Sequence, residues 1–563
     1  MKIIFSTLHS KYIHASLALP YLATYCGDLN CDIEIKEFTT HEPKENILAL
    51  LLENDPDVVV FSVYLWNRCE TLELVDALAI VNPGIKIVLG GPEVSFDCLE
   101  LFDTHPGLSV LVRGEGELPL HGLLKSWLRH EAPHGIPRLA WRNVDQVVEG
   151  PDGPLLENLD DIPSPFAAGL VDPERGFTYL ETSRGCPYRC SFCMSSRDPR
   201  VRSFSMERIQ SDLKWLMEHE VPKIKLVDRT FNYDAARARD IFNFILQHNN
   251  TSHFHFEVGA HLLDDETLTL LAKVPGDTFQ FEIGVQSTSN ETLHSIDRQV
   301  ALERLEQNVT ALHKNGNIHV HLDLIAGLPG EGYVQFKQSI DRIMALIPDH
   351  LQIEPVKLLP GSPLRGQANA LGIHFDPHPP YTVLGTPDLS YSELQKIRCM
   401  SRLLDMTWNH GRACSFLNEL AQHCGSFADG LEKLALRMNN NGDFRHPLSQ
   451  RGLFEAIADA LERELDGEPL KYLRIRLARD YALSERVSPA APPVFFDTAL
   501  TPEEAQRVKG CVDNKLETIR GRSIKLQHFS CIYTGPIPDS RQVAVYLYTT
   551  QSGAGLTCEE ILL

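Results

Sequence analysis

Several features common in proteins are missing from this chain of 563 residues. No apolar run approaches the roughly 20 residues of a membrane-spanning helix, so we expect no transmembrane segment. The first residues, MKIIFSTLHSKYIHAS, soon turn polar, which is unlike a secretory signal peptide. The 13 cysteines are mostly scattered. Together these features predict a cytoplasmic protein in a reducing compartment, without a disulfide framework.

The chain also lacks a block of lysine or arginine. It has 53 basic and 75 acidic residues, for a formal net charge of −22. Such a surface repels polyphosphate, which disfavours bulk nucleic-acid binding, although a local basic cleft is compatible with it. Hydrophobic residues make up 43% and charged residues 23% of the chain. These values are typical of a globular protein of several domains.

Residues 1–130 alternate short apolar segments with helical stretches. Strands are expected at 2–7, 57–64, 86–91 and 108–117. Apolar strands separated by helices indicate a doubly wound α/β domain, whose parallel sheet is covered on both faces. Ligands of such sheets bind beyond the carboxyl ends of the strands. The candidate segments there are 6–12, 62–65, 90–93 and 114–117.

The remaining chain divides into a linker and two further domains. Residues 131–176 are rich in Pro, Gly and Asp and are expected to be a linker. Residues 177–385 hold six strand–helix units, too few for an eight-stranded barrel, so we expect a partial (β/α)6 barrel. Residues 386–563 are expected to form a mainly helical α+β domain, with a capping box from Thr501 to Glu504 and strands at 524–533 and 543–550.

Four of the six barrel strands alternate polar and apolar residues. Because side chains alternate faces along a strand, the apolar set meets the helices and the polar set points inward. The inward set is His253, His255, Glu257, Gln280, Glu282, Gln286, His319, His321, Asp323, Gln352 and Glu354. Buried polar groups without partners are costly, so we expect a cavity for a polar cofactor. The alternatives are a polar network that satisfies itself, or a metal site built from the histidines.

Three cysteines lie close together after the first barrel strand, at Cys186, Cys190 and Cys193. No fourth cysteine follows until Cys399. Structural zinc sites need four ligands, usually as two pairs, so zinc would require a His or Asp in addition. Thiolates also hold iron–sulfur clusters. Three thiolates on a cluster of four irons leave one iron open to a chelating ligand, and we favour this interpretation.

The Cys-x3-Cys-x2-Cys spacing, with Phe192 before the last cysteine, resembles the radical S-adenosylmethionine (SAM) superfamily. The segments GVQS (284–287), DLIAGLPGE (323–331) and KLLPGSPL (357–364) resemble that superfamily's fourth, fifth and sixth strands. The resemblance implies a [4Fe-4S] cluster whose open iron chelates SAM. It further implies one-electron cleavage of SAM to a 5′-deoxyadenosyl radical, which abstracts hydrogen from a substrate.

The resemblance also assigns cofactor-binding residues. Phe192 and the backbone at Gly327 and Leu328 are expected near the adenine, and Glu282 and Gln286 near the ribose or methionine. Glu257 belongs to the same expected set. The superfamily's Gly-Gly-Glu motif, which holds the methionine amino group, is absent. Asp228 is the expected substitute, and capping of the next helix is its alternative role.

A doubly wound domain before such a barrel resembles the cobalamin-binding subgroup of this superfamily. The motifs are GGPEVS (90–95) and RGEGE (113–117), whose glycines suit a flat macrocycle laid across strand ends. The Asp-x-His-x-x-Gly motif that supplies a lower-axial histidine is missing from residues 1–130. Tyr64 and Leu65 are expected near the lower face of cobalt. The expected cobalamin-binding residues are Tyr64, Gly90, Gly91, Glu93, Gly114, Glu115 and Gly116.

The sequence therefore predicts a cobalamin-dependent radical SAM enzyme that methylates an unactivated carbon of a small molecule or peptide. Its electron donor would be a protein such as flavodoxin or ferredoxin. One alternative is a non-methylating radical cyclase of the same subgroup, similar to tetrapyrrole cyclases. A non-enzymatic sensor that binds both cofactors is the other. Methylthiolation of tRNA is disfavoured because an additional N-terminal cysteine trio and a basic surface are missing.

Overall fold

The structure is a computed structural model that describes residues 1–12, 14–96, 99–144, 146–520, 524–534, 541–551 and 556–563. The chain divides into two compact units. The first unit comprises residues 1–321, 327–331 and 355–390, and the second comprises residues 322–326, 332–354 and 391–563.

The first unit begins with a seven-stranded sheet in the order β2-β1-β3-β4-β5-β6-β7. Its strands are β1 (Lys2–His9), β2 (Asp32–Thr39), β3 (Val58–Ser62), β4 (Lys86–Gly90), β5 (Leu108–Val112), β6 (Leu139–Asn143) and β7 (Gln146–Glu149). Strands β1 to β5 are parallel, and β6 and β7 are antiparallel.

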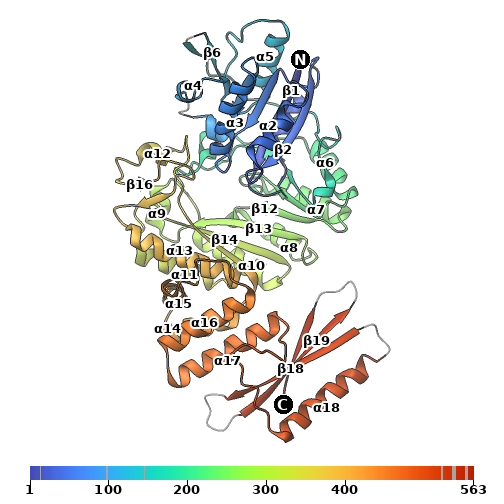
Figure 1. Ribbon diagram of the computed structural model, residues 1–563, viewed down its shortest axis with the longest axis vertical. Helices are drawn as coiled ribbons and strands as arrows, with labels where there is room; N and C mark the ends of the chain where they lie inside the picture. The colour runs from blue at the N-terminus through green and yellow to red at the C-terminus, as the bar shows by residue number, and fades with distance from the viewer. Residues whose placement is uncertain (13, 97–98, 145, 521–523, 535–540, 552–555) are drawn as a thin grey trace. The chain divides into compact units, whose positions relative to one another are not determined.

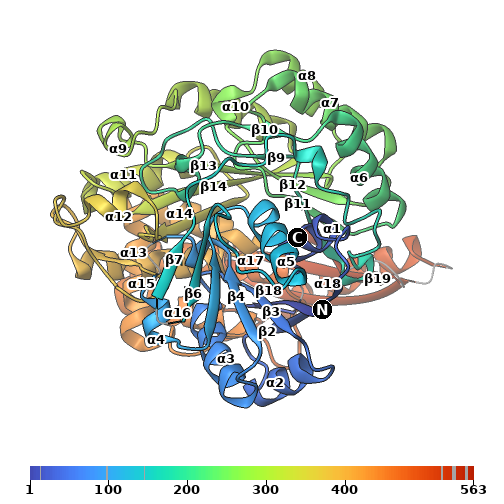
Figure 2. The same cartoon turned by 90° about the horizontal axis from the view of Figure 1, so that it is seen from above.

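Helices cover both faces of this N-terminal sheet (Figure 2). Helices α2 (Lys44–Leu52) and α3 (Arg68–Val81) pack on one face, and α1 (Ala18–Tyr25) and α5 (Glu117–Leu128) pack on the other. Strand β3 is consequently buried along its whole length. The predicted doubly wound architecture is confirmed.

Two features of this sheet differ from the sequence-based prediction. Strand β2 was not expected, because its polar side chains interrupt the apolar run that marks the other strands. Strands β6 and β7 lie inside residues 131–176, which were expected to be only a linker. They extend the sheet beyond β5 as a short antiparallel pair, an arrangement that needs no helical crossover.

The second sheet has six strands in the order β15-β14-β13-β12-β11-β8, as predicted. They are β8 (Phe177–Leu180), β11 (Lys223–Leu226), β12 (His253–Glu257), β13 (Phe279–Gln286), β14 (Ile318–Ala326) and β15 (His350–Pro355). The intervening helices include α6 (Met206–Glu218), α7 (Ala235–His248), α8 (Asp265–Leu271), α10 (Leu302–Asn315) and α11 (Tyr333–Met344). In β13 every second residue, from Phe279 to Val285, is fully buried, which confirms the predicted alternation.

The C-terminal part of the second unit is mainly helical, as expected. Its helices are α13 (Tyr391–Met406), α14 (Cys414–Cys424), α15 (Phe427–Asn441), α16 (Gln450–Glu464), α17 (Gly467–Ser484) and α18 (Pro502–Thr518). Helix α18 begins with the predicted capping box of Thr501 and Glu504. It lies beside an antiparallel sheet of β18 (Ile524–Thr534), β19 (Arg541–Gln551) and β20 (Thr557–Leu562) (Figure 1).

Within the described parts of the chain, every helix is too short or too polar to span a bilayer.

Candidate functional site

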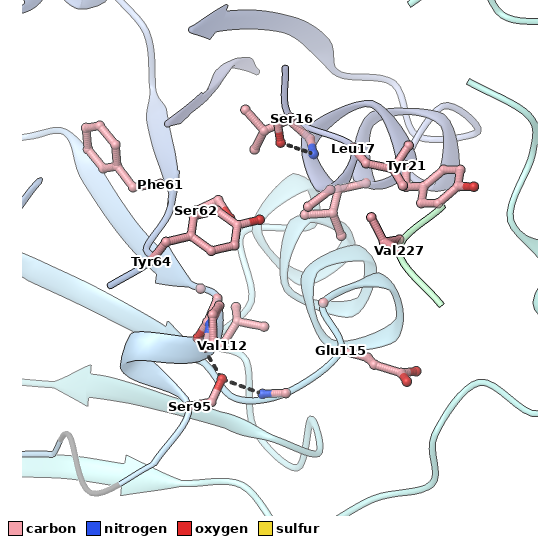
Figure 3. A pocket seen from close by; sticks show the side chains of 18 of the residues that line it. Ser16, Leu17, Tyr21, Phe61, Ser62, Tyr64, Ser95, Val112, Glu115 and Val227 are labelled. Atoms are coloured by element: carbon pink, nitrogen blue, oxygen red, sulfur yellow. Dashed lines mark hydrogen bonds between the residues drawn. The ribbon is translucent and has the colours of Figure 1, made fainter. Parts of the chain in front are cut away.

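A cavity of about 700 Å³ lies in the first unit (Figure 3). It lies between the ends of the N-terminal strands and the first two strands of the second sheet, β8 and β11. Part of its wall follows the carboxyl ends of β3, β4 and β5, the expected ligand position of a parallel sheet. The other part is formed by β8 and by the segments that follow β8 and β11. Its residues are Tyr179, Glu181, Arg184, Met194 and Val227. The volume is that of a cofactor or small-molecule site.

Glycines shape the floor of this cavity. Gly91 has φ +102°, and a Cβ added there would lie 2.5 Å from the carbonyl oxygen of Val63. Gly114 has φ +76°, and its N–H donates to the Ser95 hydroxyl at 3.0 Å. That hydroxyl in turn donates to the Gly91 carbonyl at 2.7 Å. The two glycine turns are thereby joined, and the absence of side chains lets a flat ligand approach the backbone.

Most of the residues predicted to bind cobalamin line this cavity. They are Tyr64, Gly90, Gly91, Gly114, Glu115 and Gly116. The Tyr64 ring stacks on Trp66, with 4.7 Å between ring centroids and 3° between planes. Glu93 is buried and is not among the residues that line the cavity, so its contact with cobalamin stays a prediction. Its carboxylate accepts a 2.8 Å hydrogen bond from the Tyr381 hydroxyl, so it ties the glycine turn to residues 355–390.

The three cysteines of the expected cluster lie on the loop that follows the second sheet's first strand. Cys186 and Cys190 are buried, and Cys193 is partly exposed. Burial raises the pKa of the Cys190 thiol, Arg298 lowers it, and the other two cysteines raise it further. Met194, directly after Cys193, lines the cavity. The loop therefore extends from the cysteine trio to the cavity wall.

Arg298 contacts the cysteine trio, and the sequence did not reveal this position. Its guanidinium donates to the Cys190 sulfur at 3.4 Å and also to the Gly284 carbonyl. The Thr230 hydroxyl lies 3.5 Å from the Cys186 sulfur. A cation beside the cysteines suits an anionic ligand bound there, because guanidinium pairs strongly with carboxylate. Arg298 follows no strand and completes no local motif, so only the fold reveals its position.

The cysteine trio can be compared with the donor set that each metal alternative needs. Across the described residues, no three His, Cys, Asp or Glu side chains converge as a single metal ion would require. An iron–sulfur cluster binds each thiolate through a different iron, so its ligands need not converge on one point. Three sulfurs on one loop, two of them buried, fit that group.

The inner face of the second sheet carries a charged network. Lys225 lies 3.1 Å from Glu282 and 3.8 Å from Glu257, and His255 lies 2.8 Å from Glu282. Burial alone would raise the pKa of Glu282, but His255 and Lys225 lower it to about 2. Burial lowers the pKa of His255. These ion pairs satisfy part of the polar wall, whereas the buried Gln286 Oε1 has no hydrogen-bond partner, so the structure is compatible with both predicted alternatives.

Asp228 does not cap a helix, and its contacts favour a role other than the predicted ligand role. Its side chain is fully buried and accepts hydrogen bonds from the Thr182 N–H at 3.1 Å, from the Thr182 hydroxyl at 2.6 Å and from the Ser183 hydroxyl. Helix α7 is capped by Asp234 instead. Asp228 therefore joins the ends of β8 and β11, and both of its carboxylate oxygens are occupied.

The remaining predicted SAM contacts occupy different surroundings. Phe192 is partly exposed, and the adjacent Ser191 N–H donates to the Ile296 carbonyl at 2.9 Å. Gln286 ends β13 with φ +73°, an unusual conformation for a residue other than glycine. Gly327 has φ +86°, and Leu328 is fully buried. The contact of Gly327 and Leu328 with the adenine stays a prediction.

Comparison with known proteins matches three parts of the chain. Residues 4–124 match the B12 binding domain, 180–343 the radical SAM superfamily, and 369–527 a protein of unknown function, DUF4080. The chain is 30% identical over 368 residues to the cobalamin-dependent radical SAM methyltransferase TokK of Streptomyces tokunonensis, covering 59% of this chain and 52% of TokK. It thus spans about half the length of these curated relatives.

Two further likenesses bear on fold and family. The chain is 28% identical over 361 residues to the anaerobic magnesium-protoporphyrin IX monomethyl ester cyclase of Cereibacter sphaeroides, covering 59% of this chain and 58% of the cyclase. Its fold is like that of the cobalamin-dependent S-adenosylmethionine radical enzyme OxsB, solved with aqua-cobalamin bound. The TM-score is 0.61 at 16% identity, over 86% of this chain and 81% of OxsB. The chain thus carries a region similar to the radical SAM superfamily, preceded by a region similar to the B12 binding domain and followed by a DUF4080 region.

Proposed function

We propose that this protein is a cobalamin-dependent radical SAM enzyme that methylates an unactivated carbon of a small molecule or peptide. The supporting observation is the shared cavity. It touches the strand ends of the B12 binding domain and also Met194, next to the cysteine trio. A corrin on the glycine turns would face the mouth of the radical SAM domain. TokK, which carries both functions in its name, supports the same conclusion.

The residues that would hold each cofactor follow from the site. Cys186, Cys190 and Cys193 would hold a [4Fe-4S] cluster, and Arg298 would pair with the carboxylate of SAM. When bound, the cluster and SAM supply a carbon radical that removes a hydrogen atom, and cobalamin supplies a methyl group. The proposed contacts to SAM remain Phe192, Glu257, Glu282, Gln286 and the backbone of Gly327 and Leu328.

The ends of the N-terminal strands would bind cobalamin because their shape accommodates a flat corrin ring. Gly90, Gly91, Gly114 and Gly116 admit the corrin close to the backbone, and Tyr64 would approach its lower face. The stacked partner Trp66 holds the Tyr64 ring in a single plane. Electrons would come from a protein such as flavodoxin or ferredoxin.

A second candidate is a non-methylating, ring-forming reaction on the same cofactors. The match to the magnesium-protoporphyrin cyclase supports it, because that match covers as much of this chain as the match to TokK. The two candidates differ in whether the methyl group of SAM ever reaches cobalamin.

The test needs no knowledge of the substrate. The full chain is reconstituted anaerobically with iron, sulfide and hydroxocobalamin, reduced, and given SAM labelled in its methyl group. A methylating enzyme forms 5′-deoxyadenosine and leaves label on the recovered cobalamin. A variant with all three cysteines changed to alanine should form no 5′-deoxyadenosine. Cleavage without label on cobalamin favours the cyclase candidate, and a reduced, fully loaded protein that never cleaves SAM contradicts both.

A further inference from the structure

We propose that Glu115 is a positioning residue that couples cobalamin binding to the cysteine loop. The inference rests on the proposed function, since it assigns both cofactors to this chain. Glu115 belongs to the glycine turn that lines the cavity, yet its side chain points away from Ser62 and Tyr64 (Figure 3). It was expected to contact the cofactor, and its carboxylate is used elsewhere.

Two arginines of the radical SAM domain bind the Glu115 carboxylate. Arg202 donates to its two oxygens at 2.5 and 3.1 Å, and Arg184 approaches within 3.5 Å. Both arginine side chains are largely buried, at 7% and 13% exposure, so the surrounding water screens these pairs only weakly. Burial alone would raise the pKa of Glu115, but the two arginines lower it. The carboxylate therefore stays charged near neutral pH.

The connection continues from Arg202 to the first cysteine. Arg202 also donates to the Asp198 carboxylate at 3.0 Å and to the Leu156 carbonyl at 2.6 Å. The backbone carbonyl of Asp198 accepts the Cys186 N–H at 3.2 Å. Three consecutive polar contacts thus lead from the cavity turn to a predicted cluster ligand, across two domains.

Arg184 gives a second, shorter connection. Its guanidinium binds Glu181 at 3.0 and 3.1 Å and Glu117 at 2.7 Å, in addition to Glu115. Glu117 begins α5 on the B12 side, and Glu181 lines the cavity on the radical SAM side. Arg184 lies two residues before Cys186. The cavity turn and the cysteine loop therefore share their ordering contacts.

Shared ordering predicts cooperative binding. A ligand that shifts the turn also shifts the arginines that contact the cysteine loop, and the reverse holds equally. The coupling is reciprocal, which means that each ligand raises the affinity of the other by the same factor. Cobalamin should therefore bind more tightly when the cluster is present. The coupling is measured by the ratio of the cobalamin dissociation constants without and with the cluster. A contact that only stabilises the fold would raise the unfolding temperature without changing that ratio.

The experiment measures the dissociation constant of hydroxocobalamin for the full chain with and without its cluster. We expect cluster-loaded wild type to bind about fivefold more tightly or better. In Glu115→Gln the ratio should fall well below the wild-type value, because only the Arg184 contacts to Glu117 and Glu181 remain, while both cofactors still bind. Glu149→Gln is the matched control, since it removes an Arg–Glu pair of the same domain at 2.8 Å from Arg113, with Glu149 45% exposed. Its ratio should equal that of wild type.

The outcomes distinguish a failure of the coupling from a failure of the proposed function. A wild-type ratio of one, or an unchanged ratio in Glu115→Gln, overturns the coupling while both cofactors remain bound. Failure of the wild type to bind cobalamin or a cluster overturns the proposed function, and the coupling with it. Should Glu115→Gln not fold, Arg202→Lys serves as the second variant, because it keeps the charge but loses the two-pronged contact. A wild-type ratio in that variant also contradicts the coupling.

Discussion

The N-terminal sheet and the second sheet present their candidate ligand-binding groups at different places. Strand β3 of the N-terminal sheet is buried on both faces, and the cavity is reached only past the strand ends, at glycine turns such as Gly91. Strand β13 of the second sheet buries one face and carries charged groups such as Glu282 on the other. A sheet covered twice offers a ligand mainly its backbone, whereas a sheet with an open face offers its side chains. Substitutions should therefore act differently on the two sheets.

The largest effect is expected from a single side chain at the second sheet. Cys186→Ala should reduce 5′-deoxyadenosine formation by more than about 100-fold, since loss of even an outer-shell partner of a metal costs 10- to 100-fold. Bound iron per chain should fall in parallel. Cys69→Ala, an exposed cysteine of α3, is the control and should retain both iron and rate. A Cys186→Ala protein with full iron and full rate would remove the cysteine trio from the site.

The next effect concerns the charged face of β13 and depends on pH. The pKa of Glu282 is lowered to about 2 from 4.5, so its ionised form stabilises the folded state. This contribution, on the order of 3 kcal/mol, is present above pH 4.5 and lost as the pH falls toward 2. Glu282→Gln should lower the free energy of unfolding at pH 7 and flatten its decline below pH 4.5.

Urea unfolding at several pH values tests this prediction. The control is Glu303→Gln, at an exposed position of α10, which should leave the pH dependence as in wild type. If the curves of Glu282→Gln and wild type run parallel from pH 7 to pH 2, the charged network does not stabilise the second sheet. The proposed electrostatic difference between the two sheets would then be contradicted.

The smallest effect is expected from the backbone of the N-terminal sheet. Gly91 has φ +102° and ψ 173°, a region open essentially to glycine alone, so Gly91→Ala should cost about 1–3 kcal/mol of stability. Cobalamin affinity should fall with it, because Ala would press on Val63. Gly90→Ala is the matched control for stability alone, since its new methyl group meets Val112 at an ordinary 3.6 Å and Gly90 also lines the cavity. Equal losses of stability in both variants would show that backbone conformation does not matter.

The sequence predicted local features well. The six barrel strands, their alternation and the capping box of Thr501 follow from periods of two residues and from short spacings, which neighbouring residues alone define. It was less informative where an element depends on partners distant in the chain. Strands β6 and β7 have too few apolar residues to stand out, and they form because β5 offers them a sheet edge.

Site residues show the same division. Asp228 and Glu93 are acidic residues next to strand ends, a pattern that suggests ligands, but buried hydroxyl groups occupy both carboxylates. Arg298 reaches Cys190 across 108 residues, and Arg202 reaches Glu115 across 87. No periodicity links such positions, so the sequence could not pair them.

By itself, the sequence determined which chemical groups this protein possesses: a trio of closely spaced thiols, glycine turns at strand ends and strands with one polar face. These depend on local spacing and steric limits, which act between residues a few positions apart. Only the tertiary structure decided which charges meet, because the pairing of Glu115 with two arginines and of Cys190 with Arg298 requires separate strands and loops to be brought together by burial of the hydrophobic core.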